Sequence, residues 1–333
     1  MPGIVTVTAA AAIDQTYAVA GFVPGGVNRA TSAHREISGK GVNVARAVGL
    51  GGHPVSAVLV LGEAELAMVG GSGFGELLHV VPVPGNTRLN TTILDGLGRT
   101  TKVNEGPVPL TRADWTALRD LAVAEVERLG ADWLVLSGTL PAIRERGIIQ
   151  ESGLLPIREL IDLAVAAGAR IAVDTSGTDL DALVRNLENI ALLKPNTHEL
   201  AGVVGRDLLT IGDVIGAAEE LRTRGVETVY VSMGEDGALA VAATGVWWAR
   251  ATPARLLNTA GAGDASLAGF LVNALRDDGS LDIPAAIRAA ASWGALSVSQ
   301  STTLLSDVTQ APLAELVDSP DPSRILADPG RGG

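Results

Sequence analysis

Residues 257–270 include residue types that can bind an anion and take up a proton. The stretch contains Gly261 and Gly263, then Asp264, and continues in small and apolar residues with helical spacing. Such glycines predict a tight turn that opens into a buried helix, and the free N–H groups and dipole of a helix N-terminus favour an anion. Asp264, beside this anion site, could accept the proton of an attacking hydroxyl. The alternative is an ordinary helix whose first turn is capped by Asp264.

A second glycine turn runs into a predicted helix at residues 38–48. It is not a Walker loop, because the required spacing of glycines and lysine is absent. Lys40 is flanked by Gly39 and Gly41 and could reach an anion. Asn43 lies one turn into the helix, where its amide can both donate to and accept from sugar hydroxyls.

Two further polar residues are weaker candidates. Asp14 lies just beyond a β-branched strand at residues 4–8, and ligands gather at strand C-termini in open α/β sheets. A helix cap or a surface aspartate is the simpler explanation. Arg88 lies in residues 85–90 at the start of an extended segment, where an arginine is usually solvated.

Potential ligands also follow four predicted strands. Each of these loops has an ordinary composition by itself. The C-terminal ends of parallel strands meet at one edge of a sheet, so four such loops together favour a binding site there. The loops are residues 137–141, 174–177, 194–200 and 232–237.

These loops need a parallel sheet to bring them together, and the chain beyond residue 111 predicts one. Helices are predicted at residues 112–129 and 160–167, and they alternate with apolar strands at residues 133–136, 171–173, 190–193 and 228–232. This spacing indicates βαβ units with helices on both faces of the sheet. We therefore expect an α/β fold with a doubly wound, mainly parallel sheet.

The rest of the chain is predicted to complete one domain over residues 1–333. Extended segments near residues 15–37 and 86–104 predict a small β accessory inserted into the first part of the domain. Residues 318–333 are rich in Pro, Asp and Gly and predict a loose tail. The glycine-rich segment at residues 70–75 predicts a loop without an assigned role.

Composition narrows the classes of partner. The 333 residues carry a net charge of −12 and no Lys/Arg-rich run, which argues against nucleic acid. The absence of cysteine excludes disulfides, thiolate nucleophiles and Cys-based metal sites. Neither a secretory signal nor an apolar stretch of bilayer-spanning length is evident, so we expect no membrane association and a cytoplasmic location.

With these motifs in place, the chain resembles the PfkB (ribokinase-like) family of carbohydrate kinases from residue 6 to about residue 300. It is most similar to the phosphosugar branch, which contains 1-phosphofructokinase and tagatose-6-phosphate kinase. A lone G-x-G-D sequence would be weak support, whereas several motifs in the family's order are strong support. The matching motifs are residues 39–43, 87–90, 137–141, 194–196 with Glu199, and 259–264.

The resemblance implies a ribokinase-like kinase that uses ATP and Mg²⁺, with the β accessory as a lid over the sugar and as a route to a homodimer. It implies that Asp264 is the base and that the backbone forms the anion hole at Ala260, Gly261, Ala262 and Gly263. The nucleotide side is implied to comprise Lys194, Asn196, Glu199, Ser232, Gly234, Gly237 and Thr259, with Glu199 positioning the metal through water. The sugar side is implied to comprise Asp14, Gly39, Lys40, Asn43, Arg88, Asn90 and Gly138.

The cations Lys40 and Arg88 stand out in an acidic chain and favour a substrate that is itself anionic. Fructose 1-phosphate, giving fructose 1,6-bisphosphate, is the first expectation, with tagatose 6-phosphate or fructose 6-phosphate next. Either side chain could instead contact ATP or a carboxylate.

Residues 9–12 depart from the family pattern, because they are alanines where close relatives carry Leu-Asn-Pro-Ala. The change removes an amide group and a rigid turn near the sugar. A kinase of an unphosphorylated sugar or a nucleoside therefore remains an alternative, as does a catalytically silent sugar or nucleotide sensor. A dehydrogenase is disfavoured because no G-x-G-x-x-G follows the first strand.

Overall fold

The computed structural model describes residues 1–145, 148–149, 156–276, 278–300 and 305–332. Its central feature is a ten-stranded sheet in the order β17-β16-β15-β14-β12-β11-β8-β1-β4-β5. The strands from β14 to β5 run parallel, and β15, β16 and β17 continue the sheet antiparallel. Their bounds are β1 (Ile4–Thr8), β4 (Val55–Gly62), β5 (Leu78–Val83), β8 (Trp133–Ser137), β11 (Arg170–Asp174), β12 (Leu192–Leu193), β14 (Thr228–Ser232), β15 (Ala238–Ala242), β16 (Gly245–Arg250) and β17 (Glu315–Asp318).

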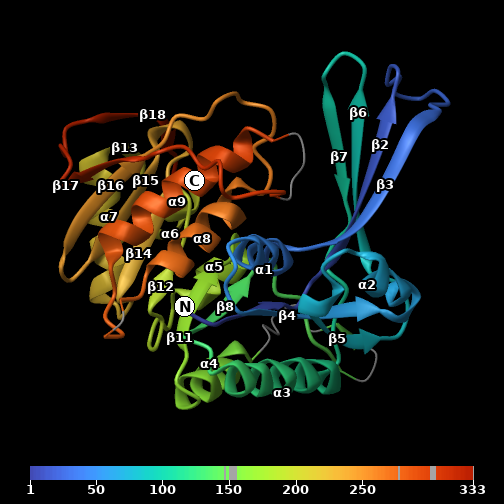
Figure 1. The fold of residues 1–333 in the computed structure, drawn as a ribbon, viewed down its shortest axis with the longest axis horizontal. Helices are drawn as coiled ribbons and strands as arrows, with labels where there is room; N and C mark the ends of the chain where they lie inside the picture. Colours follow the sequence, from blue (N-terminus) through green and yellow to red (C-terminus); the bar gives the residue numbers. More distant parts are fainter. Residues whose placement is uncertain (146–147, 150–155, 277, 301–304, 333) are drawn as a thin grey trace.

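Helices cover both faces of this sheet (Figure 1). Successive residues of a strand point to opposite faces, and Ile4 and Val5 of β1 accordingly belong to two separate hydrophobic clusters. One cluster includes α1 (Lys40–Leu50), α8 (Ala262–Asn273) and α9 (Ile283–Val298), and the other includes α3 (Arg112–Leu129), α4 (Ile157–Ala166), α5 (Thr178–Leu183), α6 (Thr197–Val204) and α7 (Ile211–Thr223). The predicted α/β fold class is confirmed.

Local sequence signals explain where helix α3 begins and ends. Thr111 and Asp114 form a reciprocal capping box at the start of α3, and Gly130 ends the helix in the left-handed conformation. The structure therefore reproduces the prediction of residues 112–129. None of the helices in the described part of the chain combines the length and apolar character needed to span a bilayer.

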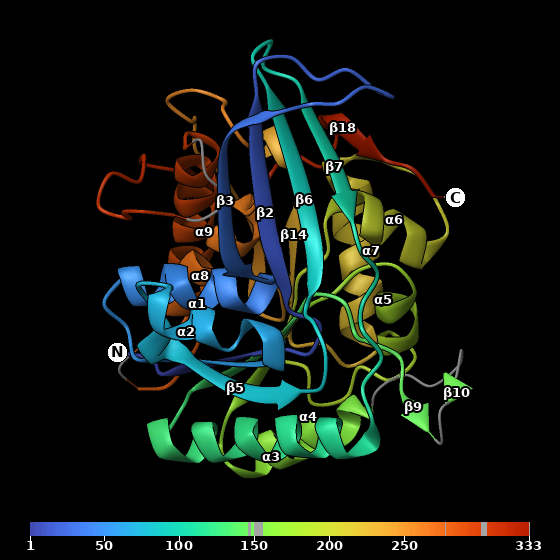
Figure 2. The ribbon, with the colours of Figure 1, turned by 90° about the vertical axis from the view of Figure 1, so that its right-hand side faces the viewer.

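A four-stranded sheet, which we call the β lid, stands away from the main body (Figures 1 and 2). Its order is β3-β2-β6-β7, and its strands are β2 (Ala12–Val19), β3 (Ala30–Ser38), β6 (Arg88–Asp95) and β7 (Thr100–Asn104). These strands include most of the two segments predicted to form the β accessory. Asp14, expected just beyond the first strand, lies within β2. The β lid meets the main body where β3 leads into α1.

The C-terminal segment differs from the prediction of a loose tail at residues 318–333. β18 (Ile325–Gly330) pairs antiparallel with β13 (Leu208–Thr210), and Leu326 is buried. The prediction is wrong for these residues because Pro, Asp and Gly signal a break in local structure but not a long-range strand pairing. The remaining short elements are η1 (Glu63–Glu65), α2 (Ala67–Gly71), η2 (Gly75–Leu77), β9 (Arg144–Glu145), β10 (Ile148–Ile149) and η3 (Gly234–Asp236).

Candidate active site

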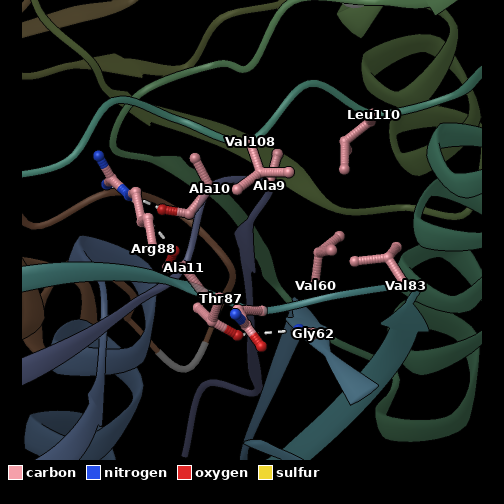
Figure 3. A pocket seen from close by; sticks show the side chains of 11 residues that line it. Ala9, Ala10, Ala11, Val60, Gly62, Val83, Thr87, Arg88, Val108 and Leu110 are labelled. Carbon is pink, nitrogen blue, oxygen red and sulfur yellow. Dashed lines mark hydrogen bonds between the residues drawn. The ribbon is translucent and has the colours of Figure 1, made fainter. Parts of the chain in front are cut away.

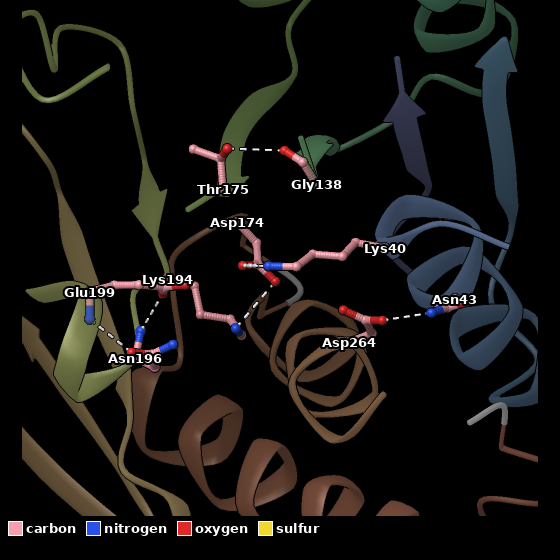
Figure 4. Close-up of polar contacts among 9 residues, drawn as sticks. All are labelled: Lys40, Asn43, Gly138, Asp174, Thr175, Lys194, Asn196, Glu199 and Asp264. Atoms are coloured by element: carbon pink, nitrogen blue, oxygen red, sulfur yellow. Dashed lines mark hydrogen bonds and ion pairs between the residues drawn. The ribbon is translucent and has the colours of Figure 1, made fainter. Parts of the chain in front are cut away.

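Four polar loops meet at one edge of the main sheet. They follow β8, β11, β12 and β14, which are consecutive neighbours and run parallel. Their carboxyl ends therefore point to the same side, as the alternating sequence pattern indicates. The amino-terminal ends of α1 and α8 bring Asn43 and Asp264 together at this edge (Figure 4).

The turn before α8 is built by a glycine. Gly261 adopts φ +80, a left-handed conformation that other residues rarely take, and α8 begins at the next residue. Asp264 lies in the first helical turn and is buried. The side-chain amide of Asn43 donates a hydrogen bond of 2.7 Å to Asp264 Oδ2. The other polar atom of the amide, Asn43 Oδ1, is buried without a hydrogen-bond partner, which is unusual for a buried polar atom.

The backbone of this turn is only partly available to an anion. The N–H of Ala260 donates to Asn258 Oδ1 at 3.0 Å, and that of Ala262 points at Thr259 O at 3.4 Å. The first-turn N–H groups, such as that of Gly263, have no acceptor within a helix. A side chain at Gly263 would lie 3.4 Å from Lys194 Nζ, so that ammonium group lies against the same turn. Of the four predicted anion-hole residues, Ala260 and Ala262 have their N–H groups engaged within the protein.

Two lysines share one carboxylate between β11 and the helices (Figure 4). Lys40 Nζ lies 3.0 Å from Asp174 Oδ1, and Lys194 Nζ lies 3.2 Å from Asp174 Oδ2. Lys194 and Asp174 are buried, whereas Lys40 is partly exposed. Asp174 therefore holds both ammonium groups near the start of α8.

Charge and burial set different pKa values for the two aspartates. Burial raises the pKa of Asp264 to about 6, and the charge of Asp174 adds to the rise, against the hydrogen bond of Asn43 and the charges of the lysines. Burial alone would also raise the pKa of Asp174, but Lys194 and Lys40 outweigh it and lower that pKa below its usual value. Burial alone would lower the pKa of Lys194, but the charges of Asp174 and Asp264 outweigh it and raise that pKa above its usual value. Asp264 is thus the member of the cluster that can exchange a proton near neutral pH.

Asn196 and Glu199 form the capping box that starts α6. Asn196 Oδ1 accepts from the N–H of Glu199, and Glu199 Oε2 accepts from the N–H of Asn196, both at 2.8 Å. Across the described residues, no group of three or more His, Cys, Asp or Glu side chains could hold a metal ion by itself. One carboxylate with a second oxygen to spare suits Mg²⁺, which keeps several waters and binds mainly to substrate phosphates.

The segments predicted to line the nucleotide adjoin this capping box. The N–H of Ser232 donates to Pro195 O at 3.1 Å, and the hydroxyl of Thr197 donates to Ser232 O at 3.4 Å. Gly234 begins η3 and Gly237 follows it. The structure therefore brings the β14 turn to the start of α6, while Thr259 lies in the turn before α8.

The predicted sugar residues lie where the β lid joins the main body. Asn90 Nδ2 donates to Asp14 Oδ1 at 3.1 Å across paired strands. Ala12 pairs with Arg88 on one side and with Ser38 on the other. The backbones of Arg88 and Ser38 therefore lie two strand spacings, or about 10 Å, apart. Gly39 caps α1, and Gly138 approaches the side chain of Lys40. The structure thus gathers these residues beside the sheet edge.

Arg88 is held by backbone carbonyls. Its Nε, Nη2 and Nη1 donate to Ala11 O, Ala10 O and Glu105 O at 3.3, 3.0 and 3.3 Å. A guanidinium has five N–H donors, so the side chain keeps donors for a ligand while its position is fixed. Beside it lies a small, open hollow with mainly apolar walls that include the alanines at residues 9–11 (Figure 3). Asp264 and the two lysines do not line this hollow, so it adjoins the sugar side of the site and does not include the charged cluster.

Two residues that shape the site received no role from the sequence. Asp174 follows an apolar strand and was one polar residue among several in its loop, and its lysine partners are remote in sequence. Asn258 precedes the glycine turn and holds the N–H of Ala260. The only sequence signal for Asp174 was its position at the end of a predicted central strand.

Comparison with known proteins gives a consistent result. Residues 80–310 match the family described as pfkB family carbohydrate kinase. The 1-phosphofructokinase of Rhodobacter capsulatus is 36% identical over 271 residues, which cover 80% of this chain and 82% of that protein. The 1-phosphofructokinase of Escherichia coli strain K12 is 29% identical over 310 residues, covering 90% of this chain and 93% of that protein. The crystal structure of phosphofructokinase-2 from E. coli in complex with fructose-6-phosphate gives a TM-score of 0.76 at 28% identity, over 90% of this chain and 94% of that chain.

These findings define the class of protein as an enzyme that transfers a phosphoryl group to a sugar hydroxyl, with ATP as its co-substrate. More particularly, the chain belongs to the pfkB family of carbohydrate kinases. The resemblance stated from the motifs is confirmed.

Proposed function

We propose that the enzyme phosphorylates fructose 1-phosphate with ATP to give fructose 1,6-bisphosphate. The relatives named 1-phosphofructokinase support a phosphorylated ketohexose as the acceptor. The observation that carries the proposal is the pair of cations Lys40 and Arg88, which are the first residues of α1 and β6, the elements that also carry the predicted sugar residues Asn43 and Asn90. An anionic acceptor makes charge-assisted hydrogen bonds to such groups. Tagatose 6-phosphate and fructose 6-phosphate are the next candidates.

In this proposal Asp264 takes the proton of the acceptor hydroxyl as its oxygen attacks the terminal phosphorus of ATP. The new O–P bond forms while the bond to the ADP oxygen breaks, so the displaced electron pair leaves with ADP. Asn43 orients Asp264 and the acceptor. The N–H groups of Gly261 and Gly263 at the start of α8, together with Lys194, stabilise the charge on the transferring group.

The donor side follows the same reasoning. Asn196 and Glu199 would position Mg²⁺ through water, and the ion when bound would neutralise charge on the phosphates. Ser232, Gly234, Gly237 and Thr259 would line the nucleotide. The capping box supports this role because it fixes both side chains through Glu199 Oε2 and Asn196 Oδ1, and the other carboxylate oxygen of Glu199 takes no part in the box.

The β lid would close over the acceptor and exclude water, which otherwise competes as the phosphoryl acceptor. We also propose that two lids join a homodimer, because Val103 on β7 and Leu94 on β6 are exposed apolar side chains on this sheet. A single domain over residues 1–333 and a cytoplasmic location complete the proposal. Light scattering of the intact chain, compared with a Val103→Lys variant, tests the dimer: loss of the dimer in the variant supports it.

An ADP-release assay with Mg-ATP tests the acceptor. The panel holds fructose 1-phosphate, fructose 6-phosphate, tagatose 6-phosphate, fructose, ribose and common nucleosides. A wide preference for fructose 1-phosphate supports the proposal, and a preference for another phosphosugar changes only the acceptor. Preference for a neutral acceptor contradicts the role given to Lys40 and Arg88.

A further inference from the structure

A buried carboxylate lies behind the turn that is proposed to line the nucleotide. Asp236 is the last residue of η3 and is 4% exposed. The turn itself closes through its own backbone, since the N–H of Met233 donates to Gly237 O at 2.8 Å and that of Asp236 to Met233 O at 2.9 Å. These bonds leave the Asp236 side chain free to contact another part of the chain.

That other part is the C-terminal strand β18. Asp236 Oδ2 accepts the N–H of Ala327 at 2.7 Å and lies 3.4 Å from that of Asp328. Its second oxygen lies 3.7 Å from Arg324 Nη2, in the segment leading into β18. The carboxylate therefore ties the turn to residues that lie 91 and 92 positions later in the chain.

Trp248 closes this contact into a ring of interactions. The Arg324 guanidinium lies 4.5 Å from the centre of the Trp248 ring, and the indole N–H donates to Asp236 O at 2.7 Å. A planar guanidinium can stack on an aromatic ring and pair with a carboxylate at once, which a lysine cannot reproduce. The turn is thus held through both its backbone and its side chain.

The same strand also contacts the start of α6. A side chain at Gly330 would approach Thr197 O to 2.4 Å, so the backbones of β18 and α6 lie in direct contact there. Thr197 directly follows Asn196. One strand therefore touches both parts of the proposed donor side: the β14 turn and the helix start that carries Asn196 and Glu199.

We propose that Asp236 and Arg324 are positioning residues for ATP, which hold the β14 turn against β18 and fix its distance from the start of α6. This inference rests on the proposed donor site at that turn. Neither residue is placed in contact with the acceptor. Their loss should therefore weaken the binding of ATP while leaving the acceptor side unaffected.

The test uses Arg324→Ala in the full chain, with Arg324→Lys to restore the charge but not the stacking. We expect the Ala variant to raise the KM for ATP, and the calorimetric Kd for Mg-ATP, by roughly 3- to 30-fold, as for residues that act through a neighbour. The Lys variant should fall in between. The turnover number and the KM for the acceptor should stay within about twofold. Asp236→Asn should act in the same direction.

The matched control is Arg331→Ala, which removes a 2.8 Å ion pair to Asp207 from the same C-terminal segment but does not touch the turn. An equal loss of ATP affinity in this control, an equal rise in both KM values, or unchanged ATP affinity in folded Arg324→Ala would each overturn the inference. If Asp236→Asn does not fold, the two Arg324 variants decide. A wild-type chain that binds ATP but phosphorylates no sugar phosphate contradicts the proposed function alone, because calorimetry still tests Arg324; one that binds no ATP overturns the inference.

Discussion

The charged side chains of the sheet edge are more deeply buried than most of those on the β lid. At the edge, Asp174, Lys194 and Asp264 are 1%, 5% and 6% exposed and have charged or hydrogen-bonding partners. On the β lid, most of β3 is exposed, and Lys102 lies open to solvent on β7. Buried charge pairs therefore fix the geometry of the edge, whereas the β lid has fewer buried charge contacts to fix its own.

The difference has an energetic side. Lys40 and Lys194 balance Asp174 and an ionised Asp264, so the cluster tolerates burial only while its members are paired. Exposed ion pairs contribute roughly 0–1 kcal/mol each and can be lost with little effect. Substitutions of the buried charges at the edge should accordingly have large effects on stability, and substitutions of exposed ion pairs small ones.

The largest expected effect is that of Asp264→Asn. Removing the proposed base should lower turnover by roughly 10²- to 10⁴-fold while ATP binding stays nearly unchanged. Because burial raises the pKa of Asp264, its ionised form is unfavourable in the folded protein, and the neutral amide should keep or raise the melting temperature. Steady-state kinetics, calorimetry with ATP and thermal unfolding check these points together. Near-normal turnover would remove Asp264 from its role.

Asp174→Asn should come second. It leaves the buried ammonium of Lys194 without its carboxylate, which should cost roughly 3 kcal/mol of unfolding free energy. Displacement of both lysines should lower kcat/KM by roughly 10- to 100-fold. Urea unfolding and kinetics measure the two effects. Asp181→Asn, on the exposed surface of α5, is the matched control and should change neither; equal behaviour of the two variants would contradict the role of Asp174.

The pH profile sharpens the comparison further. Proton uptake requires ionised Asp264, whose pKa is raised to about 6, so kcat/KM should fall by about tenfold per unit as the pH drops below that value. The charge of Lys40 lowers the pKa of Asp264. Lys40→Met should therefore move the acid limb of the pH profile to higher pH, in addition to weakening the binding of the acceptor. A limb that stays in place in this variant would show that another group is titrating.

Local patterns predict the elements of the edge better than they predict its contacts. Apolar runs and capping residues identify most central strands and α3, and the glycine turns identify the starts of α1 and α8. The two-residue strand β12 is shorter than the predicted strand at residues 190–193, although the backbone of Ala191 still bonds to Ile171 of β11 and Thr228 of β14. The contact of Lys40 with Asp174 spans 134 positions and depends on strand order, which no local pattern contains. The pairing of β18 with β13 was missed for the same reason.

The smallest expected effect lies where the two regions meet, at Arg46. This residue lies one turn after Asn43 on α1, with its guanidinium 4.5 Å from the Phe74 ring and 3.7 Å from Glu36 on β3. It thus joins the β lid to the helix that carries Lys40 and Asn43. Both contacts are partly exposed, so Arg46→Ala should reduce the unfolding free energy by only about 1 kcal/mol.

Kinetics should nevertheless reveal the link. If the β lid is aligned with the edge through α1, Arg46→Ala should raise the KM for the acceptor by roughly 2- to 5-fold and leave the KM for ATP unchanged, since a small misalignment affects mainly the substrate that the lid covers. Arg35→Ala, at an exposed position of β3, is the control and should leave both KM values unchanged. A rise in the KM for ATP alone would mean that α1 aligns the donor side, and the two regions would then not be coupled through Arg46.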